Sequence, residues 1–194
     1  MELIFSTQNQ NKAKEIQNLV PQGIIVKTLQ DINCSDDIPE TSNTLDGNAS
    51  LKANYVHNKF HVNCFADDTG LEIEALNLEP GVYSARYAGP ERSDDKNMDL
   101  VLSKLEGNDN RKAQFRTAVS LIIDGKEHLF EGIVTGEIRK EKTGSEGFGY
   151  DPIFEPENSG KTFAEMSTEE KNKVSHRARA FSKMIDFLNQ YQNK

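Results

Sequence analysis

The sequence contains only two cysteines, Cys34 and Cys64, among its 194 residues, so a network of disulfides does not hold the fold together. It also lacks an apolar run of the roughly 20 residues that a membrane-spanning helix needs. The segment Met1–Phe5 has neither the basic residues nor the long apolar stretch of a secretory signal. We therefore expect a cytoplasmic protein with reduced thiols and no membrane partner.

Positive charge is scarce as well. The chain has 23 Lys and Arg against 31 Asp and Glu, which gives a formal net charge of -8. Such a surface repels polyanions, so long nucleic acid is not an expected partner. A small anionic ligand is still compatible with this charge, because a few local cations and a metal ion are enough to hold it.

A zinc site is the first candidate that the sequence offers. His57, His61 and Cys64 lie close together, and the two histidines are one helical turn apart. However, Cys64 belongs to an apolar run in which a buried thiol is ordinary packing, and no fourth ligand lies nearby. We therefore do not expect a structural zinc ion.

Hydrophobic periodicity predicts alternating strands and helices. Strands are expected at residues 3–5, 24–26 and 63–66, and a hairpin at residues 115–138 with its turn at Asp124-Gly125. Helices are expected where apolar residues recur every three or four positions, at residues 13–20, 45–60, 94–105 and 178–188.

These elements predict an α/β fold with a mixed central sheet flanked by helices. The strands that alternate with helices favour parallel pairing, and the hairpin adds an antiparallel part. We find no internal repeat, low-complexity tract or linker in the sequence. The whole chain, residues 1–194, is therefore expected to form one domain with two lobes.

The stretch Phe65–Ile73 is the most informative part of the chain. An apolar run ends in Asp67 and Asp68, and Thr69-Gly70 then predicts a tight turn at the end of a strand. Strand ends that face a crevice are where open α/β sheets bind ligands. Two adjacent carboxylates can hold a hard divalent cation and take a proton from water, although a solvated acidic turn has the same pattern.

Glu40 lies in a polar, acidic segment just before the predicted helix at residues 45–60. That segment is able to fold back to the acidic turn, where Glu40 would add a further oxygen ligand for a cation. The alternative is a solvated loop carboxylate.

The polar loop Ser6–Asn11 follows the first strand and precedes a helix. Unpaired backbone N–H groups at a helix N-terminus attract phosphate, and this order of elements is similar to that of phosphate-binding turns. Lys12 opposes the helix dipole, which suggests that its charge serves a ligand. Alternatively, Asn9 or Asn11 caps the helix.

The glycine-rich stretch Thr143–Phe154 is the second informative segment. Glycines on both sides of Phe148 let the backbone approach a flat ligand, and its ring is suited to stack on a base. Asp151 is placed to accept hydrogen bonds from a base or a ribose. The alternative is a glycine-rich loop with a phenylalanine in the core.

Several cations have two interpretations. Arg86 is able to bind a phosphate or to pair with a structural carboxylate. Lys171 and Arg177 are candidates for phosphate or base contacts. His176 adjoins Arg177 at the start of the last predicted helix. Ser175 is suited to cap that helix. For both cations the alternative is a solvated helix face.

Taken together, the segments resemble the inosine triphosphate pyrophosphatase family. The matching segments occur in the family's order over nearly the whole chain: Ser6–Lys12, Glu40-Thr41, Ala66–Leu71, Pro80–Gly89, Gly147–Pro152, Glu169–Asn172 and Ser175–Arg177. The chain departs from the family in two places: Gln8 stands where glycine is usual, and Thr69 stands where serine is usual. Thr69 keeps the hydroxyl, whereas Gln8 changes the backbone freedom of the first loop.

The resemblance implies an elongated sheet, two lobes with the active site in the cleft between them, and a homodimer. It implies hydrolysis of ITP, dITP and XTP between the α and β phosphates, with Mg²⁺ as cofactor. Asp68 would be the catalytic base, and Glu40 and Asp68 would hold the metal. The implied substrate-binding residues are Thr7, Gln8, Asn9, Gln10, Asn11, Lys12, Thr69, Phe148, Gly149, Tyr150, Asp151, Lys171, His176 and Arg177.

Two other functions fit the same residues. One is a pyrophosphatase of modified pyrimidine nucleotides, and the other is a nucleotide-sensing module that binds without cutting. The crowded carboxylates argue against the sensing module, because a pure binder gains little from extra negative charge beside a triphosphate.

Overall fold

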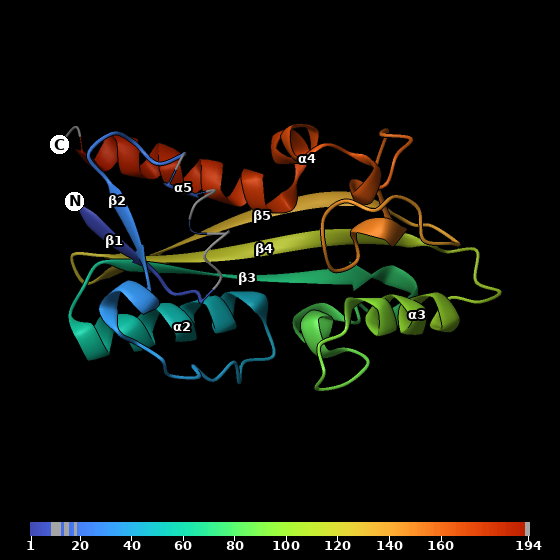
Figure 1. Ribbon diagram of the computed structural model, residues 1–194, viewed down its shortest axis with the longest axis horizontal. Helices are drawn as coiled ribbons and strands as arrows, with labels where there is room; N and C mark the ends of the chain where they lie inside the picture. Colours follow the sequence, from blue (N-terminus) through green and yellow to red (C-terminus); the bar gives the residue numbers. More distant parts are fainter. Residues whose placement is uncertain (9–12, 14–15, 18, 193–194) are drawn as a thin grey trace. The chain divides into compact units, whose positions relative to one another are not determined.

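The computed structural model describes residues 1–8, 13, 16–17 and 19–192, and it forms one six-stranded mixed sheet with helices (Figure 1). The sheet order is β2-β1-β3-β4-β5-β6, with β1 parallel to β2 and β3, and β5 antiparallel to β6. The strands and helices are β1 Glu2–Phe5, β2 Ile25–Thr28, α2 Leu45–Phe60, β3 Cys64–Ile73, α3 Asp94–Lys104, β4 Lys112–Ile123, β5 Lys126–Ile138, β6 Phe154–Pro156, α4 Thr168–Val174 and α5 His176–Gln192. The α/β class predicted from the sequence is confirmed.

The chain divides into two compact units. Unit 1 comprises Met1–Asp68, Ala118–Glu131 and Ala180–Lys194, and unit 2 comprises Thr69–Thr117 and Gly132–Arg179. Strands β3, β4 and β5 contribute residues to both units. The cleft expected between two lobes stays a prediction.

Unit 1 buries hydrophobic side chains on both faces of its strands, with α2 on one side and α5 on the other (Figure 1). Phe5 stacks on Phe65 with ring centroids 4.4 Å apart, and Phe181 of α5 meets both rings edge-on. Ile4 lies between Leu3 and Phe5 in β1, so its side chain points to the opposite face of the sheet, where it packs in the same cluster as Ala53 of α2. Cys64 and Ala66 of β3 belong to this same cluster. Because side chains alternate between the two faces along a strand, the even-numbered residues at the start of β3 lie on the side of α2.

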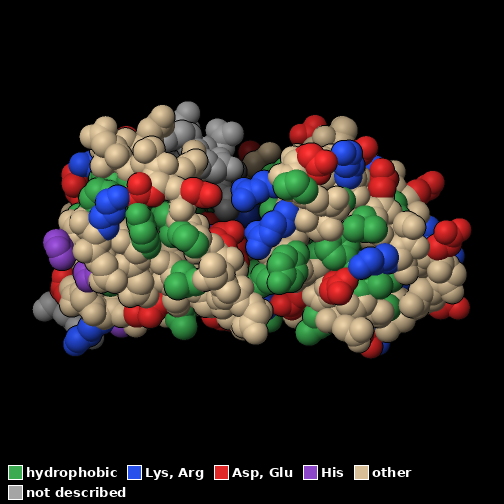
Figure 2. Space-filling view, turned by 90° about the horizontal axis from the view of Figure 1, so that it is seen from below, with side chains coloured by type: hydrophobic (Ala, Val, Ile, Leu, Met, Phe, Trp, Pro, Cys, Tyr) green, Lys and Arg blue, Asp and Glu red, His purple; other side chains and the backbone are tan. Residues whose placement is uncertain are grey.

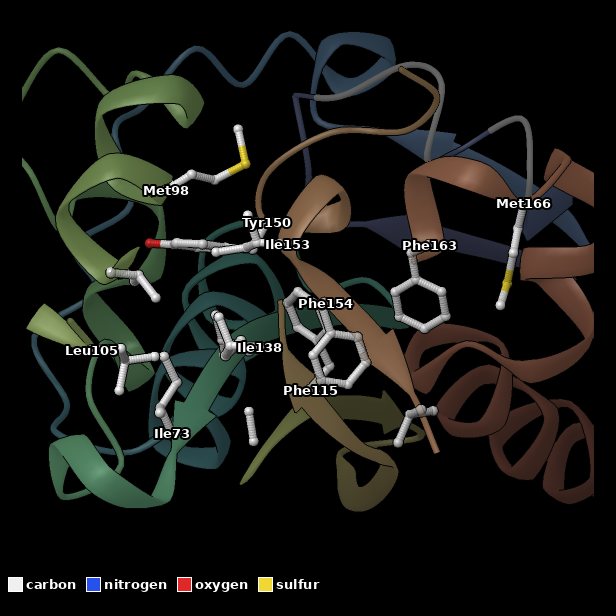
Figure 3. Close-up of a cluster of buried hydrophobic side chains, with 14 residues drawn as sticks. Ile73, Met98, Leu105, Phe115, Ile138, Tyr150, Ile153, Phe154, Phe163 and Met166 are labelled. Carbon is white, nitrogen blue, oxygen red and sulfur yellow. The ribbon is translucent and has the colours of Figure 1, made fainter. Parts of the chain in front are cut away.

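Unit 2 has a separate core, shown in Figure 3. Ile73 of β3, Leu105 after α3 and Phe115 of β4 are buried in it, together with Phe154 of β6. The rings of Phe115 and Phe154 meet edge-to-face with centroids 4.7 Å apart. The α3 boundaries agree with the predicted helix at residues 94–105.

The predicted turn at Thr69-Gly70 is wrong. Strand β3 runs without a break from Cys64 to Ile73, and Gly70 is buried inside it. The hydroxyl of Thr69 hydrogen-bonds that of Thr117 at 2.8 Å, and Leu71 N–H donates to Ser84 Oγ at 2.9 Å. Because Leu71 and Ile73 are both fully buried, continuing the strand gains more apolar burial than turning would.

Other local predictions are confirmed. Asp124 and Gly125 form the hairpin turn with φ values of 48° and 73°, as the sequence pattern requires. Cys64 is fully buried, and its Sγ donates to the carbonyl of Ala53 at 3.2 Å, which is a packing role.

Outside the cores, the surface is of mixed charge. On the face shown in Figure 2, acidic, basic and hydrophobic side chains are interspersed. None of the helices in the described part of the chain is long and apolar enough to cross a membrane.

Candidate active site

In unit 1, Glu40 and Asp68 lie together beside α2, with Asn48 and Lys52 of that helix; we call these four residues the acidic cluster. Lys52 Nζ is 2.6 Å from Glu40 Oε1 and 3.7 Å from Asp68 Oδ1. Asn48 Nδ2 donates to Asp68 Oδ2 at 3.2 Å. The segment that carries Glu40 therefore does fold back to the paired carboxylates.

Local sequence explains this convergence. Asp68 follows Cys64 and Ala66 in the period-two alternation, so its side chain belongs to the side of α2, whereas Asp67 belongs to the other side. Asn48 and Lys52 are four residues apart and thus share one face of α2.

The start of α2 fixes the preceding loop. Thr44 caps the helix by accepting a hydrogen bond from Gly47 N–H at 3.1 Å. A Cβ at position 47 would lie 2.0 Å from Ser42 Oγ, so glycine is needed for the loop to approach the helix this closely.

The acidic cluster carries an excess of negative charge. Burial raises the pKa of Asp68 to about 6; Lys52 opposes this rise, while the charge of Glu40 adds to it. Burial lowers the pKa of Lys52, but the charges of Asp68, Asp67 and Glu40 outweigh that effect, and its pKa is raised overall. The two carboxylates of the cluster outnumber its one ammonium, and the nearby charge of Asp67 adds to this negative excess.

The donor set suits a magnesium ion that is also held by substrate. Mg²⁺ is usually bound through one or two carboxylates and substrate phosphates rather than by a cage of protein ligands. Glu40 and Asp68 supply such carboxylates, and the Lys52 ammonium shows that positive charge is accommodated between their oxygens. No group of three or more His, Cys, Asp or Glu suited to a metal occurs among the described residues. Magnesium stays a prediction.

Unit 2 holds a second group, Phe148, Asp151, Lys171 and Arg177, which we call the aromatic cluster. The Phe148 side chain is 57% exposed. Lys171 Nζ lies 4.9 Å from the centre of its ring and Arg177 Cζ lies 5.4 Å from it. An exposed ring with two cations beside it offers a stacking surface to a flat, anionic ligand.

Two carboxylates hold the loop that carries Phe148. The N–H of Phe148 donates to Asp151 Oδ2 at 2.9 Å, and the N–H of Gly149 donates to Asp94 Oδ2 at 2.7 Å. Gly147 has a φ of 80°, and a Cβ there would lie 2.0 Å from Asp151 Oδ2, so only glycine fits. The ring is therefore presented by an anchored loop.

Three of the predicted substrate-binding residues have buried side chains in unit 2. Tyr150 is buried and donates its hydroxyl to the carbonyl of Ser84 at 2.7 Å. His176 is 4% exposed and stacks on Phe115 with ring centroids 4.6 Å apart. Asp151 is 3% exposed and pairs with Lys171. Contacts of these side chains with substrate stay predictions.

The first loop is described only in part. Thr7 is partly buried, its N–H donates to the carbonyl of Phe5 at 2.7 Å, and Gln8 is exposed. The remaining predicted phosphate contacts lie outside the described residues: Asn9, Gln10, Asn11 and Lys12. Thr69 lies next to Asp68 on β3.

Sequence reasoning missed Asn48, Lys52 and Asp94. A signal for the first two was present, because these polar residues flank Ala49 and Ala53 on the apolar side of a helix. Asp94 had no such signal, since a carboxylate in the first turn of a helix is common for electrostatic reasons alone.

Comparison with known proteins places the chain in a family. The sequence model described as the Ham1 family matches residues 3–187. The chain belongs to the Ham1 family. This result confirms the resemblance to inosine triphosphate pyrophosphatases that the motifs indicated.

Ham1-family relatives match over nearly their full length. A protein of Flavobacterium johnsoniae named dITP/XTP pyrophosphatase is 55% identical over 188 residues, which cover 97% of this chain and 98% of the relative. One of Bacillus subtilis with the same name is 44% identical, with 96% of each chain covered. The Staphylococcus aureus Ham1 protein matches in structure with a TM-score of 0.94 and 38% identity, covering 98% of this chain and 100% of that one.

Proposed function

We propose that this protein hydrolyses the non-standard purine nucleoside triphosphates dITP, ITP and XTP to the monophosphate and pyrophosphate. The observation that carries the proposal is the acidic cluster, Glu40, Asn48, Lys52 and Asp68, in a chain whose full-length relatives are named dITP/XTP pyrophosphatases. Buried carboxylates next to a cation are suited to metal-assisted attack of water on a phosphoanhydride.

Glu40 and Asp68 would hold Mg²⁺ at the triphosphate. Bound there, the ion would neutralise phosphate charge and lower the pKa of a coordinated water. Asp68 would take the proton from that water at Oδ1, a role that is supported by the hydrogen bond that Oδ2 accepts from Asn48. A carboxylate that also binds metal is a weak base, so the base and the metal share the activation.

The aromatic cluster would recognise the purine. Phe148 would stack on the base, while Arg177 and nearby backbone N–H groups would donate to the oxygen at its six position. Adenine has a donor there, and each unmet buried donor costs about 1–3 kcal/mol, or roughly tenfold to a hundredfold in selectivity. Lys171, which lies against both Phe148 and Asp151, would add positive charge for the phosphates.

A substrate panel tests the proposal. Purified protein with Mg²⁺ should release pyrophosphate, not orthophosphate, from ITP, dITP and XTP, and should lose this activity in EDTA. ATP, dUTP and methylated pyrimidine nucleotides should be much poorer substrates. A preference for the pyrimidines would favour the related pyrimidine pyrophosphatase, and tight binding of ITP without cleavage would favour the sensing module.

Assembly and location are separate proposals. A homodimer and a cytoplasmic location are supported by the family resemblance. Sedimentation equilibrium would test the homodimer, with the mass of two 21.8 kDa chains as the expected result.

A further inference from the structure

We propose that Asn48 is a positioning residue that ties the loop carrying Glu40 to the carboxylate of Asp68, so that the two proposed metal ligands are held as a pair. This inference rests on the proposed function, because it assigns Asn48 a task in the same site. Asn48 itself would touch neither the metal nor the nucleotide.

Both ends of the Asn48 amide are engaged. The residue is 1% exposed, its Oδ1 accepts from Ser42 N–H at 2.9 Å, and its Nδ2 donates to Asp68 Oδ2 at 3.2 Å. Its own backbone N–H donates to Thr44 O at 3.1 Å, which fixes it in the first turn of α2. A buried amide with such fixed partners has one orientation, because rotating it would leave polar groups unpaired.

The partners of Asn48 explain what this orientation does. Ser42 is two residues beyond Glu40, so holding its N–H limits where the Glu40 backbone lies. Asp68 Oδ2 accepts a hydrogen bond from the planar amide of Asn48, while Lys52 Nζ lies 3.7 Å from Asp68 Oδ1. The amide thus sets the rotation of the Asp68 carboxylate and leaves Oδ1 for metal and water.

Lys52 alone would not set this geometry. Its ammonium is a compact charge on a flexible stem, and it attracts both carboxylates without fixing the plane of either. In metal sites, partners that orient the ligands typically matter by about 10–100-fold in metal affinity or activity. We expect an effect of this size for Asn48.

The experiment compares Asn48→Ala with Asn54→Ala. Asn54 is a matched control, since it lies in the same helix and its Nδ2 donates only locally, to Ser50 O at 2.9 Å. Two quantities are measured: the Kd for Mn²⁺ without nucleotide, by electron paramagnetic resonance, and kcat and KM for ITP at saturating metal. Circular dichroism and Tm monitor folding, and Asn48→Ser, which is too short to bridge both partners, replaces the alanine variant if that does not fold.

Asn48→Ala should weaken Mn²⁺ binding or lower kcat by about 10–100-fold, with KM for ITP changed less than about threefold, while Asn54→Ala matches the wild type. A merely structural role predicts a lower Tm with the Mn²⁺ Kd and kcat unchanged. Mn²⁺ Kd and kcat both within about threefold of the wild type, or a loss confined to KM, would overturn the assignment. If the wild type itself neither binds Mn²⁺ nor cleaves ITP, the proposed function fails instead.

Discussion

The acidic cluster of unit 1 and the aromatic cluster of unit 2 have opposite charge balances. In the acidic cluster, Glu40 and Asp68 outnumber the single ammonium of Lys52, and all three side chains are largely buried. In the aromatic cluster, Lys171 and Arg177 outnumber one carboxylate, and the Phe148 ring is mostly exposed.

This difference indicates a division of tasks. An excess of buried carboxylate is suited to a divalent cation and to proton transfer, whereas an exposed ring with cations is suited to holding a base and its phosphates. Changes in the acidic cluster should therefore act mainly on kcat and on metal affinity. Changes in the aromatic cluster should act mainly on KM.

The largest expected effect is that of Asp68→Asn. Removing the base and a metal ligand should lower kcat for ITP by at least about 10³-fold, in the upper part of the range for a general base. Pyrophosphate release measures the loss. Because burial already disfavours the Asp68 charge, the neutral variant should keep its fold by circular dichroism. Turnover within a few-fold of the wild type would show that another group is the base.

Next in size is Phe148→Ala. Stacking on a base is worth about 1–3 kcal/mol, so KM for ITP should rise roughly tenfold to a hundredfold with a smaller change in kcat. Phe148→Tyr should restore KM, because it keeps the ring. Leu78→Ala, at a residue that is equally exposed in unit 2, is the control and should change nothing. An unchanged KM in Phe148→Ala would remove the ring from base recognition.

A third test concerns stability without metal. Lys52→Met leaves the partly buried carboxylates Glu40 and Asp68 without their cation, which should cost more stability than the roughly 0–1 kcal/mol of an exposed pair. Urea unfolding in EDTA should show this loss, and added Mg²⁺ should recover part of it. Lys59→Met, which breaks the more exposed pair with Asp36, should have a clearly smaller effect. Equal losses would mean that Lys52 is an ordinary surface cation.

The smallest expected effect concerns Asp36, on the loop before Glu40. Hydrogen bonds from Lys59 and then Tyr55 lower the pKa of Asp36 from its ordinary 3.8 to about 2. The folded state therefore favours the ionised carboxylate. Its contribution to the free energy of unfolding is complete above pH 3.8 and is lost as the pH falls through about 2. The difference in urea midpoint between wild type and Asp36→Asn should be constant above pH 3.8 and should shrink as the pH falls from there through about 2. A difference independent of pH would contradict the assignment.

Much of the fold was predictable because its patterns are local. The alternation along β4 and β5 and the Asp124-Gly125 turn each depend on neighbouring residues. The turn predicted at Thr69-Gly70 failed because burial of Leu71 in the core of unit 2, a nonlocal contact, outweighs the turn preference of glycine.

The candidate site was predictable only in the residues that belong to recognisable sequence motifs. Asp68 stood out through its neighbour Asp67, and Glu40 through its polar, acidic segment just before the predicted helix. Asn48 and Lys52 were missed because their partners, Asp68 and Glu40, lie 20 and 12 residues away in the chain, and their polar positions beside Ala49 and Ala53 do not by themselves name those partners.

The most direct test of the account is the position of Mn²⁺ in a crystal of the protein with a non-hydrolysable ITP analogue, measured by anomalous scattering. One peak is expected at bonding distance from oxygens of Glu40 and Asp68, about 2.1 Å as for Mg²⁺. A peak bound to neither carboxylate, with the nucleotide present, would contradict the assignment of the acidic cluster as the metal site.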